Sequence, residues 1–215
     1  GSDAPARRAR DKQERREAIL DAAERVFAAK GPSQATMDDV AEAAAVSKGT
    51  VYLYFRGKDD LFVALTHRPL APGRARFAAL EATPELDGYA LLRRLLETHA
   101  EVVQAHAMHF RLALSSMCGG FAPDPSTPSL GDYSERVRTL RAAYHGAIAR
   151  GVADGSIRAD VEPERVGAAL WAGMFGATFL RMNAPFFEAR LAKDDPLDFE
   201  RLVPSLADLL LQALA

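Results

Sequence analysis

Apolar residues recur every three or four positions along most of the chain, the spacing that gathers them on one face of an α-helix. The first clear stripe predicts a helix over residues 11–30, ended by Gly31 and Pro32. No stretch alternates apolar and polar residues as a β-strand would. The pattern therefore predicts an all-α protein of about nine or ten helices.

Two short helices in close succession are the most distinctive part of the pattern. Thr36 can cap the first, with Asp39 placed as in a capping box, and Ser47 can cap the second. The second helix exposes small polar residues while Val51 turns inward. Two such helices joined by a tight turn are typical of a helix-turn-helix, whose second helix enters the major groove of DNA.

Prolines and glycines divide the rest of the chain. Pro69 should end a helix that starts near Asp59, because the residue before proline avoids helical geometry, and Pro72 with Gly73 should prolong the break. Pro204 lies inside the last expected helix, where it can introduce a kink. The remaining helices are expected over residues 74–82, 86–117 (as one long helix or two in sequence), 132–154, 163–182 and 198–214.

The composition is that of a globular protein. The net charge does not indicate DNA binding, so that function would depend on where the basic residues lie. The chain is 48% apolar and 26% charged, and its formal net charge is −2. Residues 7–16 nevertheless hold six bases against two acids, and Lys48, Arg56 and Lys58 flank the second short helix. Phosphate contacts depend on such local charge rather than on the total.

The same composition points to the cytoplasm. Cys118 is the only cysteine, so no intrachain disulfide can form and a reducing compartment is natural. No apolar core follows the basic N-terminus, so no secretory signal is expected. The longest largely apolar run, residues 166–180, is shorter than the roughly 20 residues that span a bilayer. We therefore expect no association with a membrane.

The segment over residues 45–55, AVSKGTVYLYF, followed by KDDL at 58–61, resembles the signature of the TetR family of bacterial transcriptional regulators. The match extends back through ILDAA at 19–23 and Phe27 to Gly31, so it covers about the first 65 residues densely. Beyond them the likeness rests on a helical body of the expected length. The resemblance implies a homodimer that binds a pseudo-palindromic DNA operator, most often as a repressor, and that responds to a small-molecule effector.

The residues expected to contact DNA lie on or beside the second short helix. Gly49 would let the backbone approach the duplex, and the neighbouring hydroxyl and ammonium groups would reach phosphates or base edges. Tyr52 and Tyr54 have a second interpretation as half-buried structural aromatics. The full set is Thr36, Ser47, Lys48, Gly49, Thr50, Tyr52, Tyr54 and Lys58.

A second set of residues mixes histidines with apolar side chains in the later helices. A mostly apolar cavity with a few polar groups suits an apolar or aromatic ligand with a histidine as hydrogen-bond partner. The alternative is that these residues simply fill a core, and no metal-ligand spacing accompanies the histidines. The expected pocket comprises His99, Val103, His106, Phe110, Met117, Tyr144, Trp171, Met174 and Phe175.

Small and large apolar residues alternate irregularly over residues 166–180, which favours close approach of another helix. In the TetR family this helix and the last one build a four-helix dimer interface, while the alternative is packing within one chain. The residues expected in the interface are Val166, Ala169, Gly173, Ala177, Leu202, Leu206, Leu209 and Leu210.

These patterns divide the chain into four parts: a flexible basic tail (1–10), a helix-turn-helix DNA-binding domain (11–56), a connecting helix and break (57–73), and a ligand-binding and dimerisation domain (74–215). No nucleophile elbow, phosphate loop or paired-carboxylate motif is present, so neither an enzyme activity nor a cofactor is expected. The alternative function is a helical protein that binds or sequesters small molecules without specific operator binding.

Overall fold

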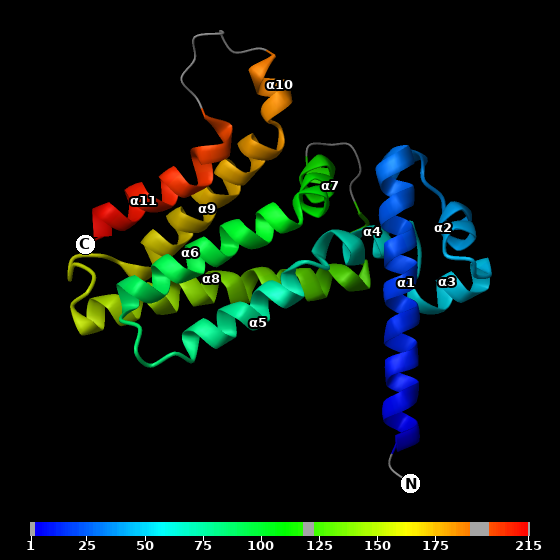
Figure 1. The fold of residues 1–215 in the computed structure, drawn as a ribbon, viewed down its shortest axis with the longest axis horizontal. Coiled ribbons are helices and arrows are strands. Elements are labelled where there is room, and N and C mark those ends of the chain that lie inside the picture. The colour runs from blue at the N-terminus through cyan, green and yellow to red at the C-terminus, as the bar shows by residue number, and fades with distance from the viewer. Residues whose placement is uncertain (1–2, 118–122, 190–197, 215) are drawn as a thin grey trace. The chain divides into compact units, whose positions relative to one another are not determined.

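The computed structural model describes residues 3–117, 123–189 and 198–214, without the side chains of residues 3 and 115–117, and these residues form helices and no strand (Figure 1). The helices are α1 (Asp3–Gln34), α2 (Met37–Ala43), α3 (Lys48–Tyr54), α4 (Lys58–His67), α5 (Leu70–Glu81), α6 (Gly88–Ala105), α7 (Ala107–Met117), α8 (Pro128–Asp154), α9 (Pro163–Met182), α10 (Ala184–Glu188), the 3-10 helix η1 (Phe199–Arg201) and α11 (Leu202–Leu214). The prediction of an all-α protein is confirmed.

The chain forms two compact units. The N-terminal unit comprises residues 1–68 and 112–133, and the C-terminal unit comprises residues 69–111 and 134–215. Helices α7 and α8 therefore each contribute residues to both units. We describe each unit separately.

In the N-terminal unit, α1 packs against α2 and α4, and α2 packs against α3. The predicted apolar stripe of α1 faces the core, where Phe27 meets Phe62 of α4 edge to face at 5.6 Å between ring centroids. Val51 of α3 is completely buried. The other fully buried large side chains of this core are Ile19, Leu20, Phe55, Leu61 and Leu65.

Helix α1 begins at Asp3 rather than at residue 11, so residues 3–10, expected to be a flexible tail, are helical. Alanine and arginine, which favour helices, fill much of this segment, and sequence reasoning undervalued them because no apolar stripe accompanies them. Gly31 interrupts the helix as expected, with φ 75° and ψ 158°, a conformation that glycine adopts readily.

The expected break at residues 69–73 is much shorter. Helix α4 ends at His67, as Pro69 requires, but α5 already begins at Leu70. Pro72 and Gly73 then lie within the first turn of α5, where a missing N–H is tolerated because those groups have no intrahelical acceptor. Pro204 is accommodated in the same way in the first turn of α11.

In the C-terminal unit, α6 packs against α5 and α11, and α11 runs along α9 (Figure 1). The long stripe over residues 86–117 forms two helices in sequence, because His106 leaves helical geometry with φ −124° and ψ 34°. Fully buried side chains from four helices fill the core of this unit: Leu92, Leu95, Leu96, Tyr144, Ile148, Leu170, Met174 and Val203.

Candidate DNA-binding site and effector region

Reciprocal hydrogen bonds fix the start of α2. Thr36 Oγ1 accepts from the Asp39 amide at 3.1 Å, and the Asp39 carboxylate accepts from the Thr36 amide at 3.0 Å, so the predicted capping box is present. Lys30 Nζ donates to the same carboxylate at 2.7 Å. These bonds, that of Lys30 first, hold the pKa of Asp39 below its ordinary value.

A left-handed residue makes the turn between α2 and α3. Ala45 has φ 53°, and the following Val46 donates its amide to Ala41 O at 3.0 Å. Ser47 then starts α3, and its hydroxyl accepts from the Thr50 amide at 3.1 Å. Local bonds therefore set the angle at which α3 leaves the turn.

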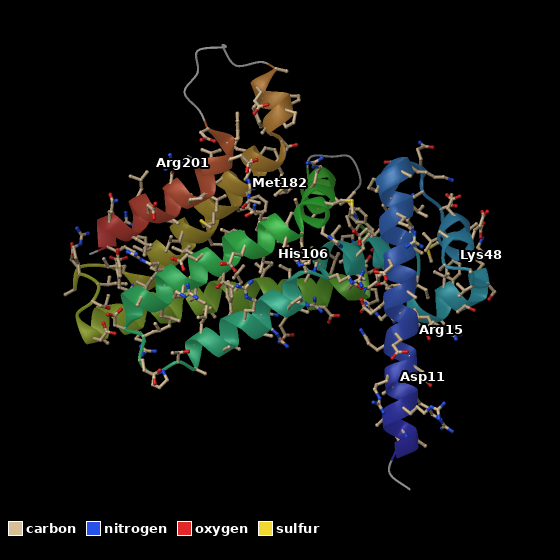
Figure 2. All side chains as sticks on the ribbon, in the orientation of Figure 1. Asp11, Arg15, Lys48, His106, Met182 and Arg201 are labelled. Carbon is tan, nitrogen blue, oxygen red and sulfur yellow. The ribbon has the colours of Figure 1, made fainter. Side chains whose placement is uncertain are left out.

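Helix α3 buries one residue and exposes most of the others. Lys48 lies at the surface (Figure 2). Gly49 is also exposed, Tyr52 is 46% exposed and Leu53 is 81% exposed. Tyr54 is half-buried and packs against the core of the N-terminal unit. Tyr52 is therefore exposed enough to reach DNA. Tyr54 instead has the surroundings expected of a half-buried structural aromatic residue.

Sequence reasoning missed Leu53 as a surface residue of α3. Its helical position, two residues after the inward-facing Val51, was the available signal. Gly49 is also informative, because a Cβ there would meet nothing closer than Ser47 Oγ at 3.8 Å. The fold itself therefore does not require glycine at this position.

The two lysines beside α3 have partners within the chain. Lys48 Nζ contacts the Asp38 carboxylate at 2.9 Å, and this hydrogen bond raises the pKa of Lys48. Lys58 Nζ donates to Ser33 O at 3.0 Å. The hydroxyls of Ser47 and Thr50 lie 2.8 Å apart. Of the predicted DNA-contact residues, Thr36, Ser47, Lys48, Gly49 and Tyr52 are exposed, whereas Thr50, Tyr54 and Lys58 are half-buried.

A polar pair formed by the buried Tyr144 and the half-buried His99 lies at the core of the C-terminal unit. Tyr144 Oη of α8 and His99 Nδ1 of α6 are 2.9 Å apart, and Met174 of α9 belongs to the same core. Burial lowers the pKa of His99 to about 4 and raises the pKa of Tyr144 well above its ordinary value of 10. Both side chains are therefore neutral near pH 7.

The other expected pocket residues are distributed over α6, α7 and α9. Val103 is buried, and the half-buried His106 lies edge-on to His109 with 5.8 Å between ring centroids. Trp171 stacks on Phe175 at 5.9 Å. The guanidinium carbon of Arg141 lies 5.7 Å from the Trp171 ring. Phe110 is half-buried, and the side chain of Met117 lies outside the described residues.

The structure thus pairs His99 with Tyr144, which shares the core of the C-terminal unit with Met174, and separately pairs Trp171 with Phe175. No group of three metal-binding side chains occurs within the part of the chain that the structure describes.

The residues expected in a dimer interface differ in exposure. Gly173 and Leu206 approach within the chain, since a Cβ on Gly173 would lie 3.1 Å from Leu206 Cδ2. Ala177 is buried, whereas Ala169 is exposed and Leu209 is 64% exposed. The remaining members, Val166, Leu202 and Leu210, are half-buried against the core.

The capped α2–α3 pair on a three-helix core, joined to a second helical unit, defines a helix-turn-helix transcriptional regulator. The family model for bacterial regulatory proteins of the tetR family matches residues 19–65. The chain is 30% identical to the probable HTH-type transcriptional regulator ArpR of Pseudomonas putida over 210 residues, which cover 90% of this chain and 95% of ArpR. The chain belongs to the TetR family.

Solved structures share this fold at low sequence identity. SmeT, the repressor of the Stenotrophomonas maltophilia multidrug efflux pump SmeDEF, has a TM-score of 0.67 at 22% identity, covering 93% of this chain and 89% of its own. The regulator FadR from Bacillus subtilis, in complex with stearoyl-CoA, has a TM-score of 0.65 at 18% identity. The match covers 93% of this chain and 99% of the FadR chain. Within the described residues, no helix has both the length and the apolarity to cross a bilayer.

Proposed function

We propose that this protein is a homodimeric repressor whose two α3 helices read a pseudo-palindromic operator. An apolar or aromatic effector bound in the C-terminal unit lowers its affinity for DNA. The observation that carries the proposal is the exposed surface of α3, which is rigidly capped yet leaves Tyr52 and Leu53 in solvent.

The groups on this surface match the chemistry of a major groove. Tyr52 and Thr50 have hydroxyls that can bond base edges or phosphates, and Leu53 can contact a thymine methyl group. The glycine at position 49 leaves room for the duplex to approach the backbone. Exposed ion pairs contribute little to stability, so Lys48 can exchange Asp38 for a phosphate.

The polar pair of His99 and Tyr144 supports an uncharged effector. A neutral phenol and imidazole can bond a hydroxyl or carbonyl group of a ligand, and the side chains around them are apolar. The fold accommodates stearoyl-CoA in FadR, and SmeT represses a multidrug efflux pump. These two proteins support a small-molecule effector for this chain without identifying it.

The outer face of α9 supports dimerisation. Ala168, Ala169 and Ala172 are exposed, and a Cβ on Gly176 would meet nothing within 4 Å. Such small residues allow a second helix to approach closely, and Leu209 of α11 adds an exposed apolar side chain. A twofold axis would let this one patch serve both subunits.

The DNA experiment measures binding of the full chain to its own upstream DNA and then to the shortest bound duplex. Thr50→Ala and Tyr52→Ala should each weaken specific binding by about 1–3 kcal/mol if the side chain contacts a base. Thr139→Ala, an exposed change on α8, is the matched control. Wild-type affinity in the Thr50→Ala, Tyr52→Ala double variant with the fold intact contradicts recognition by α3. Absence of any specific DNA binding favours a sequestering protein instead.

The effector experiment screens apolar and aromatic compounds for stabilisation of the protein and for release of DNA. To change the ratio of the DNA-incompetent to the DNA-competent arrangement of the protein from 1:99 to 99:1, the effector must bind the first arrangement more tightly by about 5.5 kcal/mol. Tyr144→Phe keeps the ring and removes the hydroxyl, so it should weaken an effector that bonds the polar pair. If no compound both stabilises the protein and lowers operator affinity, the effector proposal fails.

A further inference from the structure

One face of α1 changes character along its length. Ile19, Ala23 and Val26 follow each other at spacings of four and three residues, and all three are buried in the core of the N-terminal unit. Continued towards the N-terminus at spacings of four, three and four, the same face carries Arg15, Lys12 and Arg8, in that order, and all three are exposed. The face that holds the core together thus continues as a row of bases.

Arg16, which follows the last base of this row in the sequence, lies beside the end of α3. The guanidinium carbon of Arg16 lies 5.1 Å from the centroid of the Phe55 ring, and Phe55 is the residue that caps the C-terminus of α3. From this point the first turns of α1, with Asp11 and Arg15 labelled in Figure 2, project past α2 and α3 within the N-terminal unit (Figures 1 and 2). The helix that carries the row of bases therefore passes beside the C-terminal end of α3.

Acidic side chains lie mainly on the other sides of α1. Glu17 and Asp21 pair with Arg68 at 2.8 and 2.6 Å, and Glu17 also accepts from Gln13 at 2.7 Å. Asp11 lies at the edge of the basic row. Within the described part of the chain, no acidic group pairs with Arg8, Lys12 or Arg15, so these three side chains remain available.

The length of the row suits a nucleic-acid backbone. At 1.5 Å per residue, the distance along the helix from Arg8 to Arg15 is about 10 Å. This length corresponds to about three phosphate steps of one strand at 3.4 Å each. The segment over residues 4–15 buries no apolar side chain, so core packing does not explain why the helix carries this face.

We infer that the face formed by Arg8, Lys12 and Arg15 binds the phosphate backbone of double-stranded DNA that flanks the base pairs read by α3. This inference rests on the proposed operator binding and deepens it. The contact is independent of base sequence, because it uses charge alone. It makes the DNA footprint longer than the bases that determine specificity.

The test compares two double variants of the full chain on the selected operator. Lys12→Gln with Arg15→Gln removes two charges from the basic row. Arg7→Gln with Arg10→Gln removes two charges from the other sides of the same helix. Glutamine preserves helix propensity in both. Each phosphate contact that is lost should reduce the slope of the logarithm of the DNA-binding constant against the logarithm of salt concentration by about 0.9. Each such loss should also weaken binding about tenfold at low salt.

Flank length supplies the second measurement. Wild type and the Arg7, Arg10 variant should lose affinity when the duplex is trimmed to the base pairs read by α3, whereas the Lys12, Arg15 variant, which keeps only Arg8 of the row, should lose much less. Equal salt slopes in the two double variants, or equal effects of trimming, overturn the inference. Failure of wild type to bind the operator at any flank length instead overturns the proposed function.

Discussion

The Ser129 hydroxyl donates a hydrogen bond of 2.6 Å to Asp60 Oδ1. The Ser129 amide donates to the same oxygen at 3.2 Å, and the Arg56 amide donates to the other oxygen at 2.9 Å. In the same unit, His67 stacks on Tyr133 with 3.8 Å between ring centroids. The start of α8 is thus bound to α4, which directly follows the helix-turn-helix.

Helix α8 also carries a residue of the polar pair in the C-terminal unit. The helix runs without interruption from Pro128 to Asp154 and also carries Tyr144, the partner of His99. The helical hydrogen bonding of the chain is interrupted at Arg68 and Pro69, between α4 and α5.

Ser129→Ala should therefore lower the free energy of unfolding by about 1–3 kcal/mol, because Asp60 is buried and loses a charge-assisted bond. Urea unfolding measures the change, and hydrogen exchange at residues 58–67 should become faster. Ser205→Ala, at an exposed position of α11, is the control and should change stability by less than about 0.5 kcal/mol. Equal stability of both variants would show that the Ser129 bond contributes nothing.

Gly88 provides a test of packing in the C-terminal unit. A Cβ on Gly88 would lie 1.9 Å from Gly151 N and 2.6 Å from Ala147 O, both backbone atoms of α8. Gly88→Ala must therefore separate α6 from α8, and we expect it to cost about 1–3 kcal/mol or more. Thermal and urea unfolding give this value.

Gly146→Ala is the matched control in α8. A Cβ there would meet nothing within 4 Å, and the position is helical and exposed. The substitution should raise the free energy of unfolding by about 0.5–1 kcal/mol, because alanine loses less backbone entropy than glycine. A lower free energy of unfolding for Gly88→Ala and a higher one for Gly146→Ala support the close contact at Gly88. Changes of the same sign in the two variants contradict it.

Local chemistry explains what the sequence could predict. The Thr36 capping box, the Ser47 cap and the helix end before Pro69 depend on neighbouring residues, and all three are present. The bond between Asp60 and Ser129 joins residues 69 positions apart and leaves no periodic signal. The sequence placed Asp60 only at the start of one expected helix, and it left Ser129 before the next expected helix, which began at residue 132.

Helical spacing also left the partners of each face undetermined. The spacing grouped His99, Tyr144, Met174 and Trp171 in one expected pocket, and that grouping stays a prediction. In the structure Trp171 faces Arg141, because two faces of α9 are apolar and only tertiary packing decides what each one meets.

A charge on the exposed apolar edge of α11 tests the dimer. Leu209 is 64% exposed within the chain, so Leu209→Glu should leave the monomer folded while burying an unpaired charge in a dimer. Light scattering should show a dimer for wild type at micromolar concentration and an at least tenfold weaker dimer for the variant. Thr139→Glu, an exposed position on α8, adds the same charge as a control. A monomeric wild type refutes the dimer.

Leu206 is less suitable for this experiment. It contacts Gly173 within the chain, so a charge there disrupts the packing of α11 on α9 before any second subunit is involved. Loss of the dimer in a Leu206 variant would not distinguish misfolding from a blocked interface.

The polar pair of His99 and Tyr144 predicts a pH dependence of stability. The pKa of His99 is lowered by burial from 6.5 to about 4, so the unfolded chain binds more protons than the folded chain between these values. Stability supplied by neutral His99 is therefore fully present above pH 6.5 and is lost as the pH falls towards 4. The contribution amounts to about 3 kcal/mol at most, since each pKa unit corresponds to 1.36 kcal/mol.

His99→Asn isolates this contribution from other titrating groups. The asparagine amide oxygen can replace Nδ1 as the acceptor for Tyr144 Oη but cannot titrate. Urea unfolding of both proteins from pH 7.5 to 4.5 should show wild type losing stability faster than the variant, with the difference opening below pH 6.5. Parallel curves for the two proteins would mean that His99 takes up a proton as easily in the folded chain as in the unfolded one.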